Sequence, residues 1–382
     1  MADARTVLFL HSSAGRYGAD RQLEMLATGL DPARYRALVV LPDHGELGAA
    51  LRGAGVEVRV RPLAVIRRAL ATPGGAARIA AAWAADARAL AALARGRGAA
   101  VIHTNTSVTV GGAPAARLAG IPHVWHLRET FAEFPRAWPA FRRLLLTADA
   151  VPCLSQATLD QLGGAPQGRL LHEGIPELPD PPPRAEARGA LGLDPAAFVV
   201  ALPGRVIAWK GHAVLIRALA DARLRDGGAI GLLAGRAWPE EEAFAAGLDT
   251  LAAELGVAGR VRRLGHVEDI AGVYAAADVV VVPSTAPEPL GLVALEAAAL
   301  GRCVVAAAHG GLTEIVRDGE TGRLVEPGDP AALAAVLAEL AAAPERREAL
   351  GAAAAVDVRA RFSTAALLEA TQALYDEVLR GR

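Results

Sequence analysis

Glu288 and Glu296 are the residues whose types and spacing most clearly suggest chemistry. An apolar run at 279–282 comes first, then Glu288 in a proline-rich loop, and then Glu296 in a segment rich in alanine and leucine. This order predicts a buried parallel strand, a loop with a carboxylate, and a helix that begins near Leu290. At the carboxyl end of such a strand, the helix N-terminus offers N–H groups to a diphosphate, and a carboxylate can accept hydrogen bonds from sugar hydroxyls. Together these groups are typical of a nucleotide-sugar site.

Two cations, Arg205 and Lys210, follow a second predicted strand at 199–202, within a loop that contains glycine. Arginine can bind two phosphate oxygens at once, whereas lysine acts as a compact point charge. The sequence has no Asp-x-Asp pair to hold a divalent metal. We therefore expect no metal or other cofactor, and we expect these cations and the helix N-termini to stabilise a leaving diphosphate. The alternative is that both are solvent-exposed cations on a loop.

The run 283–296 resembles the E-x7-E signature of glycosyltransferase family 4, whose members are retaining enzymes of the two-domain GT-B fold. Other blocks of that family resemble stretches elsewhere in the chain, at 203–205 with 210–211, 265–267, 310–316 and 318–325. The sequence departs from the family pattern at Leu290, where Phe is more common, and at Cys303, where Pro is more common. Both departures keep an apolar residue, and the resemblance extends over nearly the whole chain.

This resemblance implies an α/β fold in which two Rossmann-like, parallel-sheet domains face each other across a cleft. It also implies a retaining, metal-independent and hexosyltransferase-like transfer of a sugar from a nucleoside-diphosphate sugar to an acceptor hydroxyl. Glu296 would bind the ribose hydroxyls, and Glu288 would bind the donor sugar and take part in catalysis with Arg205 and Lys210. The other residues expected to bind the donor are Gly15, Gly18, Gly204, Gly265, His266, Val267, Leu290, Gly291 and Leu292.

In the first half of the chain, Gly15 and Gly18 follow the first predicted strand and open a helix. They resemble the glycine-rich first loop of the family, although the adjacent glycine pair is missing and Asp20 replaces the more common Glu; a plain strand-to-helix turn is the alternative. His126 ends a predicted strand where the family often has a histidine that reaches the donor sugar. The resemblance therefore makes it a fourth candidate catalytic residue, and a structural histidine is the alternative. The candidate acceptor contacts are Asn105, Thr106, Arg128 and Glu129, with His103 on the same face.

Predicted strands alternate with helical segments along the 382 residues, which favours two parallel α/β sheets. Consecutive prolines near 176–183 interrupt this alternation. We expect an acceptor domain at 1–176, a linker at 177–184 and a donor domain at 185–363, with a final helix at 364–382 that packs back on the first domain. The predicted strands lie at 6–10, 37–41, 56–60, 100–104, 123–126, 150–154, 199–202, 230–234, 261–264, 279–282, 304–306 and 324–325.

Composition narrows the class of protein. The formal net charge is −1, so the chain as a whole is not basic and nucleic-acid binding is not expected. No apolar run reaches the length of a transmembrane helix, and the strand at 6–10 leaves no room for a signal peptide. The two cysteines, Cys153 and Cys303, fall in different predicted domains. We therefore expect a reduced, cytoplasmic protein.

Arginines gather between Arg59 and Arg97, where Asp86 is the single acid. One interpretation is a solvated helix face; the other is a basic surface for an anionic acceptor or for peripheral contact with anionic lipid at the inner membrane face. The acceptor itself stays open among small molecules, glycans and lipid-linked sugars, and the donor base stays open between UDP, GDP and others. Two alternatives to a glycosyltransferase also stay open: a sugar-nucleotide epimerase of the same fold, and a sugar-nucleotide-binding subunit without catalysis.

Overall fold

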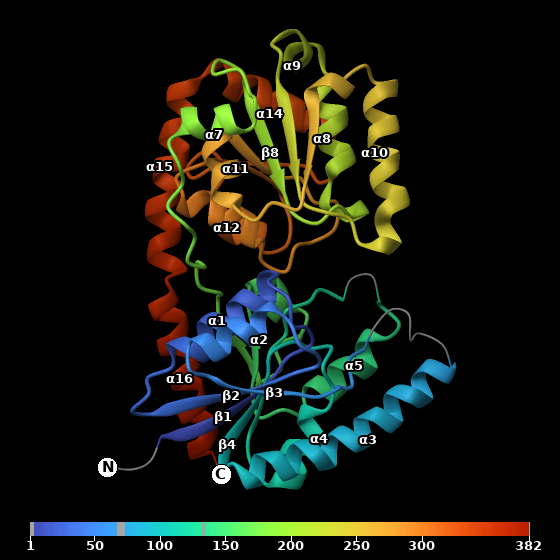
Figure 1. Ribbon diagram of the computed structural model, residues 1–382, viewed down its shortest axis with the longest axis vertical. Helices are drawn as coiled ribbons and strands as arrows, with labels where there is room; N and C mark the ends of the chain where they lie inside the picture. Colours follow the sequence, from blue (N-terminus) through green and yellow to red (C-terminus); the bar gives the residue numbers. More distant parts are fainter. Residues whose placement is uncertain (1–3, 67–72, 132–133, 382) are drawn as a thin grey trace. The chain divides into compact units, whose positions relative to one another are not determined.

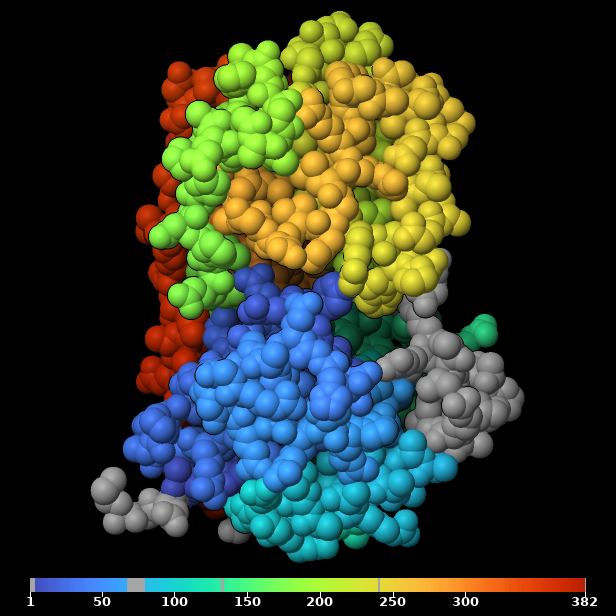
Figure 2. All heavy atoms as spheres, in the orientation of Figure 1, coloured from blue at the N-terminus to red at the C-terminus, as the bar shows by residue number. Residues whose placement is uncertain are grey.

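The computed structural model describes residues 4–66, 73–131 and 134–381. The chain divides into two compact units, Met1–Pro176 with Thr364–Arg382, and Glu177–Ser363 (Figure 1). Each unit contains a parallel sheet with helices packed on it, which confirms the predicted α/β class. In the space-filling view, most of the visible surface has the colours of segments that Figure 1 draws as helices and loops, as expected for parallel sheets buried on both faces (Figure 2).

The first unit has a five-stranded parallel sheet in the order β3-β2-β1-β4-β5. Central strand β1 is buried from its second residue onward, and β2 is buried over its last four residues, because both are almost continuous apolar runs. A short parallel pair, β6-β7, continues from β5 through bridges between Val124 and Ala150 and between Leu127 and Cys153. The strands are β1 (Arg5–Leu10), β2 (Tyr35–Leu41), β3 (Glu57–Val60), β4 (Ala99–Thr104), β5 (His123–Trp125), β6 (Val151–Cys153) and β7 (Gly168–Leu170).

The last helix of the chain, α16, belongs to the first unit. Its apolar residues join the core of β1 and α1, and Leu367 and Tyr375 are almost fully buried there. Tyr35 donates a 2.5 Å hydrogen bond to Asp376, which also pairs with Arg34 at 2.5 Å. The helices of this unit are α1 (Gly18–Gly29), α2 (Glu46–Gly53), α3 (Pro73–Gly96), α4 (Gly112–Ala119), α5 (Trp138–Leu145), α6 (Gln156–Asp160) and α16 (Thr364–Arg380).

The second unit has a six-stranded parallel sheet in the order β10-β9-β8-β11-β12-β13. Its strands are β8 (Val199–Pro203), β9 (Ile230–Ala234), β10 (Val261–Gly265), β11 (Val279–Val282), β12 (Cys303–Ala307) and β13 (Arg323–Val325). Its α-helices are α7 (Arg184–Ala190), α8 (His212–Leu219), α9 (Ala222–Asp226), α10 (Glu242–Glu254), α11 (Ile270–Ala276), α12 (Leu292–Ala299), α13 (Leu312–Ile315), α14 (Pro330–Ala342) and α15 (Pro344–Arg361). The short 3₁₀ helices are η2 (Ala208–Lys210), η3 (Pro239–Glu241) and η4 (Ala258–Arg260).

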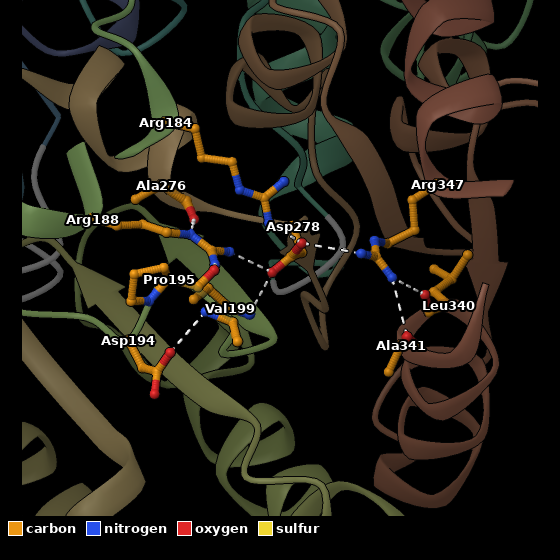
Figure 3. A network of polar contacts seen from close by, with 11 residues as sticks. Arg184, Arg188, Asp194, Pro195, Val199, Ala276, Asp278, Leu340, Ala341 and Arg347 are labelled. Atoms are coloured by element: carbon orange, nitrogen blue, oxygen red, sulfur yellow. Dashed lines mark hydrogen bonds and ion pairs between the residues drawn. The ribbon is translucent and has the colours of Figure 1, made fainter. Parts of the chain in front are cut away.

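A buried carboxylate, Asp278, joins several of these elements at the amino end of β11 (Figure 3). One of its oxygens accepts hydrogen bonds of 2.7 Å from the Arg188 guanidinium and of 2.7 Å from the Val199 backbone N–H. The other accepts from Arg184 and, at 3.2 Å, from Arg347. Asp278 therefore ties α7, β8 and α15 to the sheet, at the edge opposite the carboxyl ends of the strands.

Three of the described arginines near α3 have acidic partners. Arg59 and Arg97 each lie 2.7 Å from the same oxygen of Glu57, and Arg61 lies 3.1 Å from the buried Asp86. Glu57 lies two residues before the stretch from Arg59 to Arg97 and was not counted with it. The positive charge of this region is therefore smaller than the count of acids within the stretch suggests. Residues 67–72, which include two further arginines of that stretch, lie outside the described residues. Among the residues that are described, no helix has the length and apolarity that a bilayer crossing requires.

Candidate active site

In the second unit, the loops after β8 and β11 touch at the carboxyl edge of the sheet. The Thr285 N–H donates a 2.7 Å hydrogen bond to the Trp209 carbonyl. Gly211 has a φ of +78°, and a Cβ there would lie 1.9 Å from the Pro283 carbonyl oxygen. Only glycine fits both this backbone conformation and this close approach. The contact brings Lys210, at the end of η2, against the loop that carries Glu288.

Lys210 and Glu288 form the centre of this arrangement. The Lys210 ammonium lies 2.6 Å from a carboxylate oxygen of Glu288, whose side chain is 5% exposed. The Ser284 hydroxyl donates to the same oxygen at 2.6 Å. Lys210 is the single lysine among the 40 lysine and arginine residues of the chain. The structure thus brings together two of the predicted catalytic residues.

Ser284 is a site residue that the sequence analysis missed. It lies two residues after β11 and is fully buried, and its carbonyl lies 2.8 Å from Nε2 of His309. A hydroxyl at the carboxyl end of a strand, four residues before the candidate glutamate, is the signal that could have identified it. A hydrogen bond also joins two of the stretches that resemble family blocks, 283–296 and 310–316. The Gly311 N–H donates it to the Glu288 carbonyl at 2.9 Å.

Glu296 lies in the second turn of α12, which begins at Leu292 rather than near Leu290. The later start follows from Gly291, whose φ of +106° is outside the helical region. No side chain among the described residues caps this N-terminus, so its first N–H groups are suited to binding an anion. Glu296 is 6% exposed and accepts a 2.8 Å hydrogen bond from the Tyr274 hydroxyl. Its burial argues against an ordinary helix-surface residue.

The remaining donor candidates of the second unit lie at the same edge of the sheet. Gly204 and Arg205 follow β8, and the Arg205 guanidinium lies over the ring of Trp238, 4.4 Å from its centroid. Gly265 ends β10, and His266 and Val267 come next. β10 is separated from β8 by β9, so these three residues belong to a different part of that edge from Lys210.

In the first unit, the loop with Gly15 and Gly18 is organised by Asp20, which is fully buried in the first turn of α1. Its carboxylate accepts hydrogen bonds from the Tyr17 N–H at 2.8 Å and from the Ser13 hydroxyl at 2.5 Å, and lies 2.8 Å from His11 Nε2. Burial raises the pKa of Asp20, but its hydrogen bonds and the charge of His11 outweigh this and lower it below the usual value. Asp20 is therefore an anion that holds the loop.

Arg128 and Asn105, two acceptor candidates, contact each other in the buried interior of the first unit. Arg128 donates to the Asn105 carbonyl at 2.7 Å and to its side-chain oxygen at 3.1 Å, and it pairs with Glu173. Burial lowers the pKa of Arg128 to about 10. The guanidinium of Arg128 thus donates hydrogen bonds to protein groups, and these contacts hold Asn105 and Glu173 in place.

Glu129 and Thr106, the other two acceptor candidates, also have protein partners. The Glu129 carboxylate accepts from the Ser107 hydroxyl, from the Ser107 N–H at 3.2 Å and from the Arg128 N–H at 3.1 Å. Burial raises the pKa of Glu129 despite these hydrogen bonds and the charge of Arg128. The Thr106 hydroxyl lies 3.2 Å from that of Thr109.

His126 follows β5 directly and is fully buried. Its ring stacks on that of His103 with centroids 5.7 Å apart, and its Nδ1 lies 3.5 Å from Arg128. Burial, Arg128 and His103 hold the pKa of His126 well below the usual value, so the ring is neutral near pH 7. Its Nε2 has no hydrogen-bond partner among the described residues. A neutral imidazole with one unused nitrogen can hydrogen-bond to a sugar hydroxyl.

Family models match both units. The model described as glycosyl transferases group 1 matches residues 183–357, and the glycosyl transferase 4-like domain matches residues 17–170. The chain belongs to glycosyltransferase family 4. Within the described residues, no group of three or more His, Cys, Asp or Glu side chains could hold a metal ion.

Solved structures with the GT-B fold match nearly the whole chain. HepE of Anabaena, crystallised with UDP and glucose, is 27% identical with a TM-score of 0.83, covering 97% of this chain and 99% of that one. A glycosyltransferase from Rickettsia africae is 18% identical with a TM-score of 0.83, covering 100% of each chain. The D-inositol 3-phosphate glycosyltransferase of Mycolicibacterium gilvum is 44% identical over 223 residues, which are 56% of this chain and 47% of that protein. The chain thus spans about half the length of the curated relatives it matches.

Proposed function

We propose that this protein is a retaining glycosyltransferase that moves a hexose from a UDP-sugar to an acceptor hydroxyl. The observation that carries the proposal is the Lys210–Glu288 pair beside the uncapped N-terminus of α12. The pair unites a cation suited to a diphosphate with a carboxylate suited to a sugar. UDP is favoured over GDP because HepE, 27% identical over nearly the full length, has been crystallised with UDP and with UDP-glucose.

The chemistry follows from where charge develops. As the bond between the sugar C1 and the diphosphate oxygen breaks, negative charge grows on the leaving group. Lys210, Arg205 and the N-terminus of α12 would stabilise that charge without a metal. The new bond joins C1 to the acceptor oxygen on the same face, and the acceptor proton passes to the leaving phosphate. Glu288 would orient the sugar, and Glu296 would bind the ribose.

Neutral His126 would donate to or accept from a sugar hydroxyl through Nε2, so no step requires it to change protonation. The acceptor is proposed as a small polyol phosphate, a glycan or a lipid-linked sugar. An inositol phosphate is the first small acceptor to test, because it is the acceptor named for relatives about 45% identical over part of their length. We also propose cytoplasmic placement, with peripheral contact at an anionic membrane if the acceptor is lipid-linked.

A thermal-shift panel of UDP-, GDP- and dTDP-sugars, followed by a nucleotide-release assay with EDTA, tests this function. We expect UDP-sugars to raise the melting temperature most and UDP release to survive chelation and depend on acceptor. Stabilisation without turnover across a broad acceptor panel would instead favour a binding subunit. Conversion of the sugar without release of UDP would favour an epimerase. Loss of turnover in EDTA, restored by magnesium, would contradict the metal-free mechanism.

A further inference from the structure

Trp238 is an exposed indole at the carboxyl edge of the second sheet. It follows β9 in the chain, just before η3, and is 42% exposed, although aromatic residues make up only 4% of the sequence. The guanidinium carbon of Arg205 lies 4.4 Å from its ring centroid. Core packing does not explain a tryptophan that is this exposed. Its contact with Arg205, a candidate phosphate-binding residue, suggests another role.

The backbones on either side of this contact are held together. The Gly204 N–H donates a 2.8 Å hydrogen bond to the Ala234 carbonyl, and the Val206 N–H donates a 3.1 Å bond to the Arg236 carbonyl. A Cβ at Gly235 would lie 1.8 Å from the Gly204 carbonyl oxygen, so the two loops approach as closely as backbones can. The backbone of Arg205 is thus fixed between two hydrogen bonds to the segment that leads to Trp238.

We propose that Trp238 is a positioning residue that holds the Arg205 guanidinium for the donor diphosphate. Stacking on an indole uses the face of a guanidinium and not its in-plane N–H groups, so this contact is compatible with a side chain that binds phosphate oxygens. It also restrains a long side chain before the ligand arrives, which lowers the entropy lost on binding. This inference rests on the proposed function, because it assumes that Arg205 binds the diphosphate.

Calorimetry of UDP binding to a double-mutant cycle tests the proposal. The variants are Trp238→Leu, Trp238→Phe, Arg205→Ala and the double variant Arg205→Ala/Trp238→Leu, with Leu255→Ala as a control for loss of another part-exposed apolar side chain. We expect Trp238→Leu to weaken UDP binding about two- to fivefold, the size of an exposed cation–π contact. Trp238→Phe should retain most of the affinity. The double variant should bind no more weakly than Arg205→Ala alone.

Losses that multiply in the double variant would overturn the proposal, since Trp238 would then bind the nucleotide directly. Unchanged affinity in Trp238→Leu would overturn it as well. The contact has its own readout, because Arg205→Ala should alter tryptophan fluorescence in the wild-type background and not in Trp238→Phe. Failure of wild-type protein to bind UDP would instead contradict the proposed function, and the fluorescence comparison would still report whether the two side chains stack.

Discussion

Replacement of Asp278 by asparagine should destabilise the second unit strongly while leaving the shape of the side chain unchanged. Asp278 accepts from two donors on each carboxylate oxygen, and its side chain is 2% exposed. An asparagine has one acceptor oxygen, so its NH₂ group must face the two donors on the other side. Arg188, also 2% exposed, would lose its counter-charge.

The expected loss is about 3 kcal/mol, the lower end of the range for breaking a buried ion pair, because the amide oxygen can keep two of the four hydrogen bonds. In a domain of this size, that loss corresponds to a fall in melting temperature of about 6–12 °C. Arg184→Ala is the matched control, since Arg184 contacts the same carboxylate but is 44% exposed. A pair of that exposure contributes about 0–1 kcal/mol.

Differential scanning calorimetry measures the two variants, and hydrogen-exchange mass spectrometry localises the change. The Val199 N–H donates to Asp278, so a peptide that covers β8 should lose protection in Asp278→Asn while peptides from the first unit keep theirs. Equal losses in the free energy of unfolding for Asp278→Asn and Arg184→Ala would refute the reasoning. The burial of the charged partner would then not determine how much a broken ion pair destabilises the unit.

Four further outcomes follow from the site and the first unit. Glu296→Ala should weaken binding of free UDP, whereas Glu288→Ala should retain UDP binding in calorimetry and lose turnover; equal loss of UDP affinity in both would contradict this division. His126→Asn should keep more turnover than His126→Ala, because a neutral hydrogen-bonding group suffices; two equally inactive variants would argue for a protonated histidine. Burial lowers the pKa of His123 to about 3, so below about pH 6.5 the unfolded state binds a proton that the folded state does not. The free energy of unfolding should therefore fall by about 1.4 kcal/mol for each pH unit below that value. Urea unfolding of His123→Gln should show a shallower dependence of this free energy on pH. Co-sedimentation with anionic vesicles at low salt should retain the protein if the arginines at 59–97 bind lipid, and protein left in the supernatant would indicate a solvated face.

Strands were the most predictable part of the fold. Val279–Val282 and Val7–Leu10 are uninterrupted apolar runs, as expected where helices cover both faces of a sheet. The three-residue strand Gly168–Leu170 was missed because it is short, only partly buried and begins with glycine. The start of α12 was placed slightly early because the positive φ of Gly291 follows from its contacts and not from the local pattern.

Side-chain pairing was the part that sequence could not supply. Asp278 meets Arg188 and Arg347 across 90 and 69 positions of the chain, and no local pattern encodes such distances. Arg128 stays a candidate acceptor contact, and its ion pair with Glu173, 45 positions away, is likewise not encoded in any local pattern. In contrast, Lys210 and Glu288 were predicted to share a site because each follows a strand of the same sheet, whose carboxyl ends meet at one edge.

The most direct test of the account uses Lys210, because the chain contains no other lysine. Protein grown with ¹³C-labelled lysine should give one lysine side-chain signal in an NMR spectrum. We expect UDP to shift that signal in a saturable manner and uridine to shift it far less, since the ammonium should exchange part of its contact with Glu288 for the diphosphate. A lysine signal that stays in place while UDP saturates the protein would contradict the proposed diphosphate site.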